Sequence, residues 1–124
     1  AAIRGNRVAL AHGQLALLRG DIAHLPFGNH QFDKIFSIHS FYFWPDPREI
    51  FDQLINLLAH GGRVVSTFAT AQTLANGDRA YWPLHQRAEA LVRDVQQQAN
   101  VAAELAYGPD SRQYNNVAIV IDKL

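Results

Sequence analysis

Apolar and polar residues alternate in blocks along the chain, and their spacing predicts helices and strands in turn. The clearest element is a helix that begins after Asp46, since this residue can cap it and Pro47 suits its first turn. Glu49 follows three residues after the cap. The apolar residues that come next fall on one helical face: Ile50, Phe51, Leu54, Leu57 and Leu58. The pair Gly61-Gly62 is predicted to end this helix.

Short apolar or β-branched runs on both sides of this helix predict strands, separated by a loop at residues 25–31. The predicted strands cover residues 15–18, 34–39 and 63–69. Strands that alternate with an amphipathic helix are typical of βαβ units. We therefore predict an α/β fold with a mostly parallel sheet.

The second half of the chain adds one helix and two strands. After a polar loop at residues 70–78, a second amphipathic helix is predicted over residues 83–98. Strands are predicted at 101–107 and 117–121, on either side of the turn-rich sequence Gly108-Pro109-Asp110-Ser111. This arrangement favours an antiparallel pair at the C-terminal end.

Length and composition limit the kind of protein. The 124 residues are predicted to form a single, partial domain over residues 1–124, with 48% hydrophobic residues. The 11 basic residues are balanced by 11 acidic ones, which argues against a nucleic-acid partner. No apolar run reaches the roughly 20 residues of a membrane helix, so we expect a soluble, cytoplasmic protein without a membrane partner. The chain has no cysteine and its six histidines lack ligand spacing, so no metal site is predicted.

Two predicted strand ends are the places where a site is expected, because ligands of α/β sheets collect at the carboxyl ends of strands. Asp21 follows the first of these strands, and the aromatic sequence Phe41-Tyr42-Phe43-Trp44 follows the second. Each feature has a structural alternative. Asp21 can be a turn residue, His39 can be a structural histidine, and about half of the aromatic cluster can be core.

Four sequence motifs, in this order and spacing, resemble those of one enzyme family. They are Gly20-Asp21-x-x-x-Leu25-Pro26-Phe27, Phe32-Asp33-Lys34-Ile35-Phe36-Ser37, Phe41-Tyr42-Phe43-Trp44-Pro45-Asp46 and Leu57-Leu58-x-x-Gly61-Gly62-Arg63-Val64-Val65. The family is the class I S-adenosylmethionine-dependent methyltransferases, in the small-molecule branch that includes ubiquinone- and menaquinone-biosynthesis enzymes. The chain resembles the C-terminal two-thirds of such an enzyme, which implies a Rossmann-like methyltransferase fold.

The resemblance implies a cofactor site for S-adenosylmethionine. Asp21 would accept a hydrogen bond from the adenine amino group, and the backbone N–H of Ile22 would meet a ring nitrogen. An ionised carboxylate only accepts hydrogen bonds and an amine donates them, so this pairing is chemically sound. Ser37 and Ile38 would run beside the methionine part of the cofactor.

The resemblance also implies where the methyl acceptor would lie. Phe41 and Tyr42 would occupy the position whose side chains wall the cofactor and face the substrate. A sulfonium is a cation, so an aromatic wall beside it is favourable. His39 lies close enough in sequence to act as a base on the acceptor. The catalytic candidates are therefore His39 and Tyr42.

The chain departs from the family pattern at its beginning. The glycine-rich loop after the first strand and the acid that binds the ribose are absent, so the first βαβ unit would lie before Ala1. Residues 1–12 also predict the end of a helix, stopped by Gly13, and the chain contains no methionine. We expect a piece of a longer protein. The alternative is that an initiator methionine has been removed. A smaller departure is His60, which stands where the family usually has proline.

The missing unit would leave the strand at 15–18 without a neighbour and the strand at 34–39 with one open edge. Open edges invite pairing with another chain. We expect either further residues before Ala1 or a homodimer formed through the open sheet edges.

The expected activity is transfer of a methyl group from S-adenosylmethionine to a small molecule by in-line displacement. Such catalysis depends mainly on proximity and orientation, which agrees with the lack of an obvious catalytic dyad. The alternative is a truncated, non-catalytic methyltransferase-like fragment or binding module that cannot hold the cofactor alone. A nicotinamide-dependent Rossmann enzyme is disfavoured, because the glycine fingerprint is absent.

Overall fold

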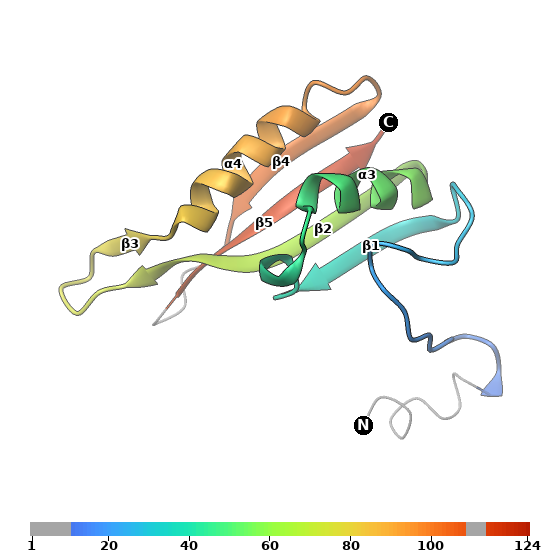
Figure 1. Ribbon diagram of the computed structural model, residues 1–124, viewed down its shortest axis with the longest axis horizontal. Helices are drawn as coiled ribbons and strands as arrows, with labels where there is room; N and C mark the ends of the chain where they lie inside the picture. Colours follow the sequence, from blue (N-terminus) through green and yellow to red (C-terminus); the bar gives the residue numbers. More distant parts are fainter. Residues whose placement is uncertain (1–10, 109–113) are drawn as a thin grey trace.

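The computed structural model of the protein describes residues 11–108 and 114–124 (Figure 1). A mixed β-sheet carries two α-helices on one face. The elements follow one another as β1 (Phe32–Ile38), a 3₁₀ helix η1 (Phe41–Phe43), α3 (Pro47–Leu57), β2 (Leu58–Thr73), β3 (Arg79–Tyr81), α4 (Pro83–Val95), β4 (Val101–Tyr107) and β5 (Tyr114–Lys123). The helix end predicted at residues 1–12 falls almost entirely outside the described residues, as does most of the turn predicted at 108–111.

The sheet combines parallel and antiparallel pairing in the order β1-β2-β5-β4. Strands β1 and β2 are parallel and are joined through α3, which makes a βαβ unit. Strand β5 is antiparallel to both β2 and β4, and β3 pairs with the end of β2. The predicted α/β Rossmann-like fold is confirmed, and so is the antiparallel pair at the C-terminal end. The sheet was predicted to be mostly parallel but is mixed, since among the described strands only β1 and β2 pair in parallel.

Helix α3 begins as predicted. The Asp46 carboxylate accepts a hydrogen bond from the backbone N–H of Glu49 at 3.2 Å, and Pro47 occupies the first turn. One face of the helix is buried against the sheet through Ile50, Phe51, Leu54, Ile55 and Leu57. The capping residues and the apolar stripe therefore determine both where the helix starts and which face it buries.

The prediction that Gly61-Gly62 ends this helix is wrong. The helix ends at Leu57, and β2 runs directly through the glycine pair. The glycines lie at an irregularity in the pairing of β1 with β2, where the register shifts: Phe32 pairs with Leu58, but Lys34 pairs with Arg63. Gly61 has a φ of +82°. A Cβ at Gly62 would lie 2.8 Å from the carbonyl oxygen of Ala59 in the same strand, and 3.1 Å from the carbonyl oxygens of Phe32 and Asp33 in β1. Only glycine fits this close approach of two backbones.

The segment predicted as a strand at residues 15–18 is not one in the structure. Two of its three leucines are exposed, Leu17 by 47% and Leu18 by 67%, and Leu15 is half-buried. A strand needs a neighbour to satisfy its backbone donors and acceptors. None of the described strands lies beside this segment, so apolar composition alone does not make it part of the sheet.

The polar stretch predicted as a loop at 70–78 is partly strand. Strand β2 continues to Thr73, and its last residues pair with β3. The turn between them is short, and Leu74 N–H donates to the carbonyl of Asp78.

Helix α4 ends at Val95, three residues earlier than predicted. No helix in the described part of the chain is long and apolar enough to cross a membrane.

Both helices lie on the same face of the sheet, and the core lies between them and the strands (Figure 1). Its largest fully buried side chains include Phe51, Phe68 and Ile119. On the opposite face no described helix covers β1, where Phe36 is 74% exposed and Ile38 60% exposed. The carboxyl end of β1 is consequently open on one side and supported by the core on the other.

The cap of α3 can be tested by two substitutions at one position. Asp46→Ala should lower the free energy of unfolding by about 1 kcal/mol, because a helix N-terminus loses its side-chain acceptor. Asp46→Asn keeps an acceptor and should cost only a few tenths of that amount. Urea unfolding of both variants measures the difference. Equal losses would mean that the charge, not the capping hydrogen bond, stabilises the helix.

Candidate functional site

The carboxyl end of β1 is tied to β2 by side chains as well as by the strand ladder. The Ser37 hydroxyl donates to the Ser66 hydroxyl at 2.8 Å, and the Thr67 hydroxyl lies 3.5 Å from the Ser37 carbonyl oxygen. Ser37 is half-buried, whereas Ile38 is exposed on the uncovered face. Of the two residues predicted beside the methionine part of the cofactor, Ser37 is bonded through its side chain to the neighbouring strand, and Ile38 exposes its side chain while its backbone stays in the strand ladder.

His39 changes the direction of the chain after β1. Its φ of +54° is in the left-handed region, which few non-glycine residues adopt. The backbone N–H of His39 donates to the Thr67 carbonyl at 2.8 Å. This bond stabilises the turn and holds the side chain at the strand end. Strained backbone of this kind is often found at functional sites.

His39 and Tyr42, the two predicted catalytic residues, are in contact. The His39 Nδ1 lies 3.2 Å from the Tyr42 hydroxyl, and the rings are nearly parallel with centroids 6.2 Å apart. The same hydroxyl accepts a hydrogen bond from the backbone N–H of Ala69. When Nδ1 carries no proton, the hydroxyl donates to it. The pair can therefore hold, accept or pass on a proton at the strand end.

The aromatic sequence divides into a buried and an exposed half. Phe41 is 2% exposed and Trp44 is 8% exposed, whereas Tyr42 is 37% and Phe43 81% exposed. The turn is a 3₁₀ helix, in which residues three apart point the same way. Phe41 and Trp44 thus face the core together, and the ring of Phe41 stacks on that of Phe68 with 4.3 Å between the ring centroids. Phe41 offers little surface to a cofactor.

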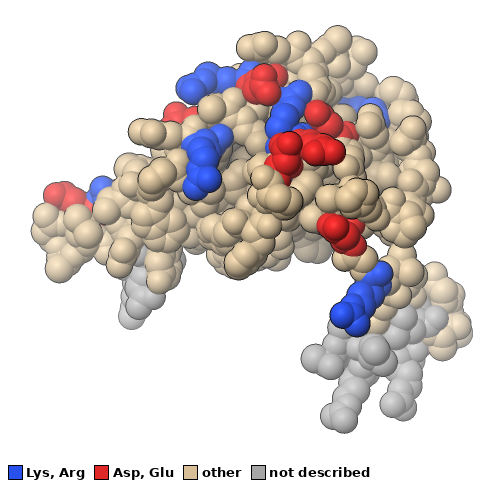
Figure 2. Space-filling model, viewed as in Figure 1, with Lys and Arg blue, Asp and Glu red and all other residues tan. Residues whose placement is uncertain are grey.

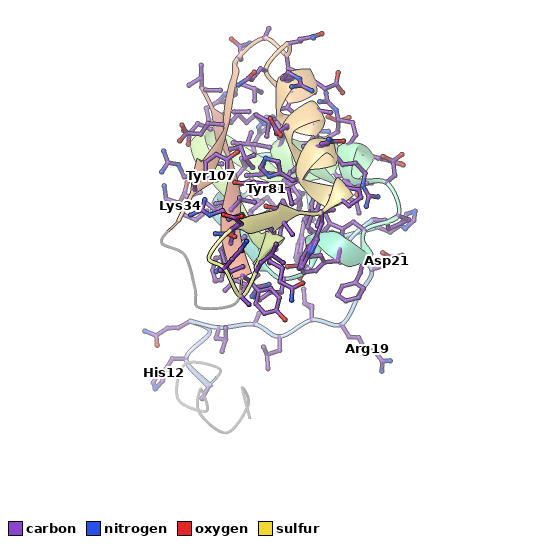
Figure 3. All side chains as sticks on the ribbon, turned by 90° about the vertical axis from the view of Figure 1, so that its left-hand side faces the viewer. His12, Arg19, Asp21, Lys34, Tyr81 and Tyr107 are labelled. Carbon is purple, nitrogen blue, oxygen red and sulfur yellow. The ribbon has the colours of Figure 1, made fainter. Side chains whose placement is uncertain are left out.

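Asp21 sits in a tight turn at the surface. Its carboxylate accepts from the Ala23 N–H at 2.9 Å, and its carbonyl accepts from the His24 N–H. The hydrogen bond from Ala23, aided by His24, lowers the pKa of the Asp21 carboxyl. Figure 3 shows Asp21 at the outer surface, on the opposite side of the view from Lys34. The structural role as a turn residue is present, and the carboxylate is also ionised and accessible.

The backbone beside Asp21 offers a donor. The N–H of Ile22 makes no hydrogen bond within the part of the chain that the structure describes. An accessible carboxylate next to a free N–H matches the edge of adenine, which presents a donating amine beside an accepting ring nitrogen. The two groups therefore have the acceptor and donor character that an adenine edge requires.

Ile22 is one of the residues that line an apolar hollow of about 300 Å³ beside β1. Leu25, Phe27 and Phe36 are among its lining residues. Such a lining suits a flat apolar group. It also joins the segment that carries Asp21 to strand β1, although no described hydrogen bond links Asp21 itself to the residues at the end of that strand.

Sequence reasoning missed the contribution of β2. Ser66, Thr67 and Ala69 fix the positions of Ser37, His39 and Tyr42 through the bonds described above. One signal was available. Ser66 is 1% exposed and falls at an inward position of the strand, between the buried residues Val64 and Phe68. A polar residue in a buried register needs a partner, which here is Ser37.

Part of the chain matches a known family of proteins. A family model described as a methyltransferase domain matches residues 2–66. No curated protein sequence is significantly similar to the chain.

Several solved structures share the fold. A protein from Pyrococcus horikoshii OT3 has a TM-score of 0.62 at 16% identity, over 98% of this chain and 66% of its own. A SAM-dependent methyltransferase from Aquifex aeolicus has a TM-score of 0.62 at 12% identity, over 92% of this chain and 60% of its own. The cyclase SpnF has a TM-score of 0.67 at 13% identity, over 98% of this chain and 61% of its own. The chain thus spans between 60% and 66% of the length of these structures.

Proposed function

Because this chain belongs to the methyltransferase domain family, we propose that it takes part in methyl transfer from S-adenosylmethionine to a small molecule. We place the chain in the small-molecule branch that includes ubiquinone- and menaquinone-biosynthesis enzymes, because its four sequence motifs resemble those of that branch. The observation that carries it is the pair formed by the Asp21 carboxylate and the free Ile22 N–H. These two groups complement the adenine edge.

Each candidate residue has a distinct task in this proposal. Asp21 and Ile22 bind the adenine, and the backbone at Ser37 and Ile38 runs beside the methionine part. S-adenosylmethionine supplies a methyl group that is activated by its attachment to a sulfonium. The strand end and its aromatic residues orient the acceptor, which is the main requirement of an in-line displacement.

His39 and Tyr42 are proposed to act on the acceptor. The Ala69 N–H holds the Tyr42 hydroxyl in place, and His39 Nδ1 lies beside it. This arrangement can hydrogen-bond an acceptor hydroxyl, amine or acidic carbon and can take up its proton. Phe41 was predicted as a wall of the cofactor. Its role in this proposal is indirect, because its ring supports Tyr42 and the turn from the core side.

The rival proposal is a non-catalytic module with the same fold. One fold can carry unrelated activities, as the likeness to the cyclase SpnF illustrates. The chain also spans less than two thirds of its structural neighbours. Binding of the cofactor product, S-adenosylhomocysteine, separates the two proposals, since only the first requires it.

Asp21→Ala should weaken the binding of S-adenosylhomocysteine by roughly tenfold or more, because a hydrogen bond to an ionised acceptor is lost. Asp21→Asn keeps an oxygen acceptor, so its affinity should fall between those of the wild type and Asp21→Ala. Calorimetric titration of the protein measures the affinities. Asp33→Ala is the matched control, since Asp33 is exposed and lies on β1. Equal affinities for wild type and Asp21→Ala would remove Asp21 from the site.

His39→Asn and Tyr42→Phe should each reduce turnover by roughly a hundredfold and change cofactor affinity much less. Both variants lose proton transfer at the acceptor while leaving Asp21 and Ile22 intact. Single-turnover methyl transfer, combined with the titration above, gives both quantities. His60→Asn is the control, because His60 lies at the other end of the sheet, near Leu124. Unchanged transfer in both variants would assign the pair to a structural role.

We also propose that two copies pair through the open edge of β1. Among the described strands β1 pairs only with β2, and Phe36 and Ile38 are exposed beside that edge. Phe36→Lys should shift the mass measured by size exclusion with light scattering from two chains to one, since edge lysines oppose strand pairing. Phe43→Lys places the same change on an exposed phenylalanine outside the strand and should leave the dimer intact. A monomeric wild-type protein would rule the pairing out.

A further inference from the structure

We propose that the hollow between η1 and α4 binds a small methyl acceptor that carries a carboxylate, with Arg87 as the anionic group's partner. The inference rests on the proposed methyl transfer for the role of the ligand as acceptor. Its chemistry is derived separately, from the lining and the charges of this hollow.

The hollow has an apolar wall and a size suited to a small organic acid. Its volume is about 260 Å³, near the lower limit of small-molecule sites. Aromatic and aliphatic side chains and prolines form most of its wall, and three charged residues complete it. The lining residues are Phe41, Tyr42, Trp44, Pro45, Asp46, Pro47, Arg48, Leu84, Arg87 and Leu91.

Of the three charged lining residues, two are already engaged. The Arg48 guanidinium lies 3.3 Å from Asp52 through Nε and 3.3 Å from Asp94 through Nη1. The Asp46 carboxylate accepts the Glu49 N–H as the cap of α3. The charge of Arg48 is thus balanced by two carboxylates, although its buried Nη1 makes no hydrogen bond among the described residues, and Asp46 is held at a helix N-terminus.

Arg87 has no hydrogen-bond or ion-pair partner among the described residues. Acidic and basic side chains lie intermingled over α3 and α4 on this face of the molecule (Figure 2). An arginine that remains unpaired beside a hollow can still form the bidentate bonds that a carboxylate accepts. A neutral acceptor would leave this group unused, and a cationic one would be repelled by it.

Tyr42 connects the hollow to the end of β1. Its ring lines the hollow, while its hydroxyl bonds to Ala69 and lies beside His39. A molecule whose carboxylate meets Arg87 would therefore share the hollow with Tyr42, which is in contact with His39. That placement brings the acceptor to one of the two residues proposed to handle its proton.

The larger hollow along α4, of about 490 Å³, does not have these properties. Its lining includes Arg93 and Asp94, and it lacks an aromatic wall. Arg93 is exposed on the same helix as Arg87 and does not line the hollow beside Tyr42. It therefore provides a matched control for the loss of one arginine charge from α4.

Sodium benzoate and its neutral isostere benzamide test the proposal directly. Each is titrated into the protein at constant ionic strength, and the NMR signals of the Trp44 indole and the Leu84 and Leu91 methyl groups are followed. Benzoate should bind at least roughly tenfold more tightly than benzamide, as expected for a charge-assisted pair. Arg87→Gln should bring benzoate to the affinity of benzamide. Arg87→Lys should retain part of the preference, and Arg93→Gln all of it.

Three outcomes would overturn the proposal: equal binding of benzoate and benzamide, no shift of the three reporter residues, or an unchanged preference in Arg87→Gln. Titration with S-adenosylhomocysteine is run in parallel. If benzoate binds as expected and S-adenosylhomocysteine does not, the anion site stands and the proposed methyl transfer fails. If only S-adenosylhomocysteine binds, the carboxylate site is wrong and the methyl-transfer proposal is unaffected.

Discussion

The hydrogen-bond ladder between β1 and β2 is the constraint on which the candidate site depends. Strand β1 has no other described neighbour, so its position is set by this one parallel pairing and by α3 above it. The ladder continues past the strand end through the bond from His39 N–H to Thr67. A parallel pair cannot be joined by a tight turn and requires a crossover. The cap at Asp46 and the apolar stripe of α3 therefore matter to the site, although neither touches it.

The polar groups near β1 show how this constraint is reinforced. Ser37 and Ser66 form a side-chain bond between the two strands on the helix-covered side. Burying either hydroxyl alone would be costly, so the two residues fix the register as a pair. On the far side of β2, Arg63 forms a bidentate pair with Asp122 of β5, which lowers the pKa of the Asp122 carboxyl. Register is thus specified on both edges of β2, where a shift would displace the site residues.

How far the sequence predicted the fold can be explained element by element. The start of helix α3 and both ends of strand β4 were predicted to the residue, because capping chemistry and short-range periodicity decide them. The run at residues 15–18 was misassigned, since pattern reports apolarity and not the presence of a neighbouring strand. Gly61-Gly62 was read as a helix stop, because a glycine pair gives no local sign that it serves close contact between two strands instead. The end of β2 was missed for a related reason: Thr70 is polar, yet it is fully buried beside β3 and α4.

In the candidate site, too, contacts between residues close in sequence were predictable, and contacts made by a distant strand were not. The contact of His39 with Tyr42 was within reach of the sequence, since the two residues are three apart at a predicted strand end. The tasks of Ser66, Thr67 and Ala69 were not, because they come from a strand about 30 residues later.

The aromatic sequence illustrates why composition could not separate core from site. A 3₁₀ turn repeats every three residues, so Phe41 and Trp44 are directed inward together while Tyr42 and Phe43 are directed outward. A regular helix or strand over the same four residues would have paired them differently. The geometry has a functional consequence, because Phe41 packs on Phe68 directly behind Tyr42, whose ring also contacts Phe68 edge-on. Phe41, which is expected to lie beside the cofactor, thus packs from the core side against the same ring that Tyr42 contacts.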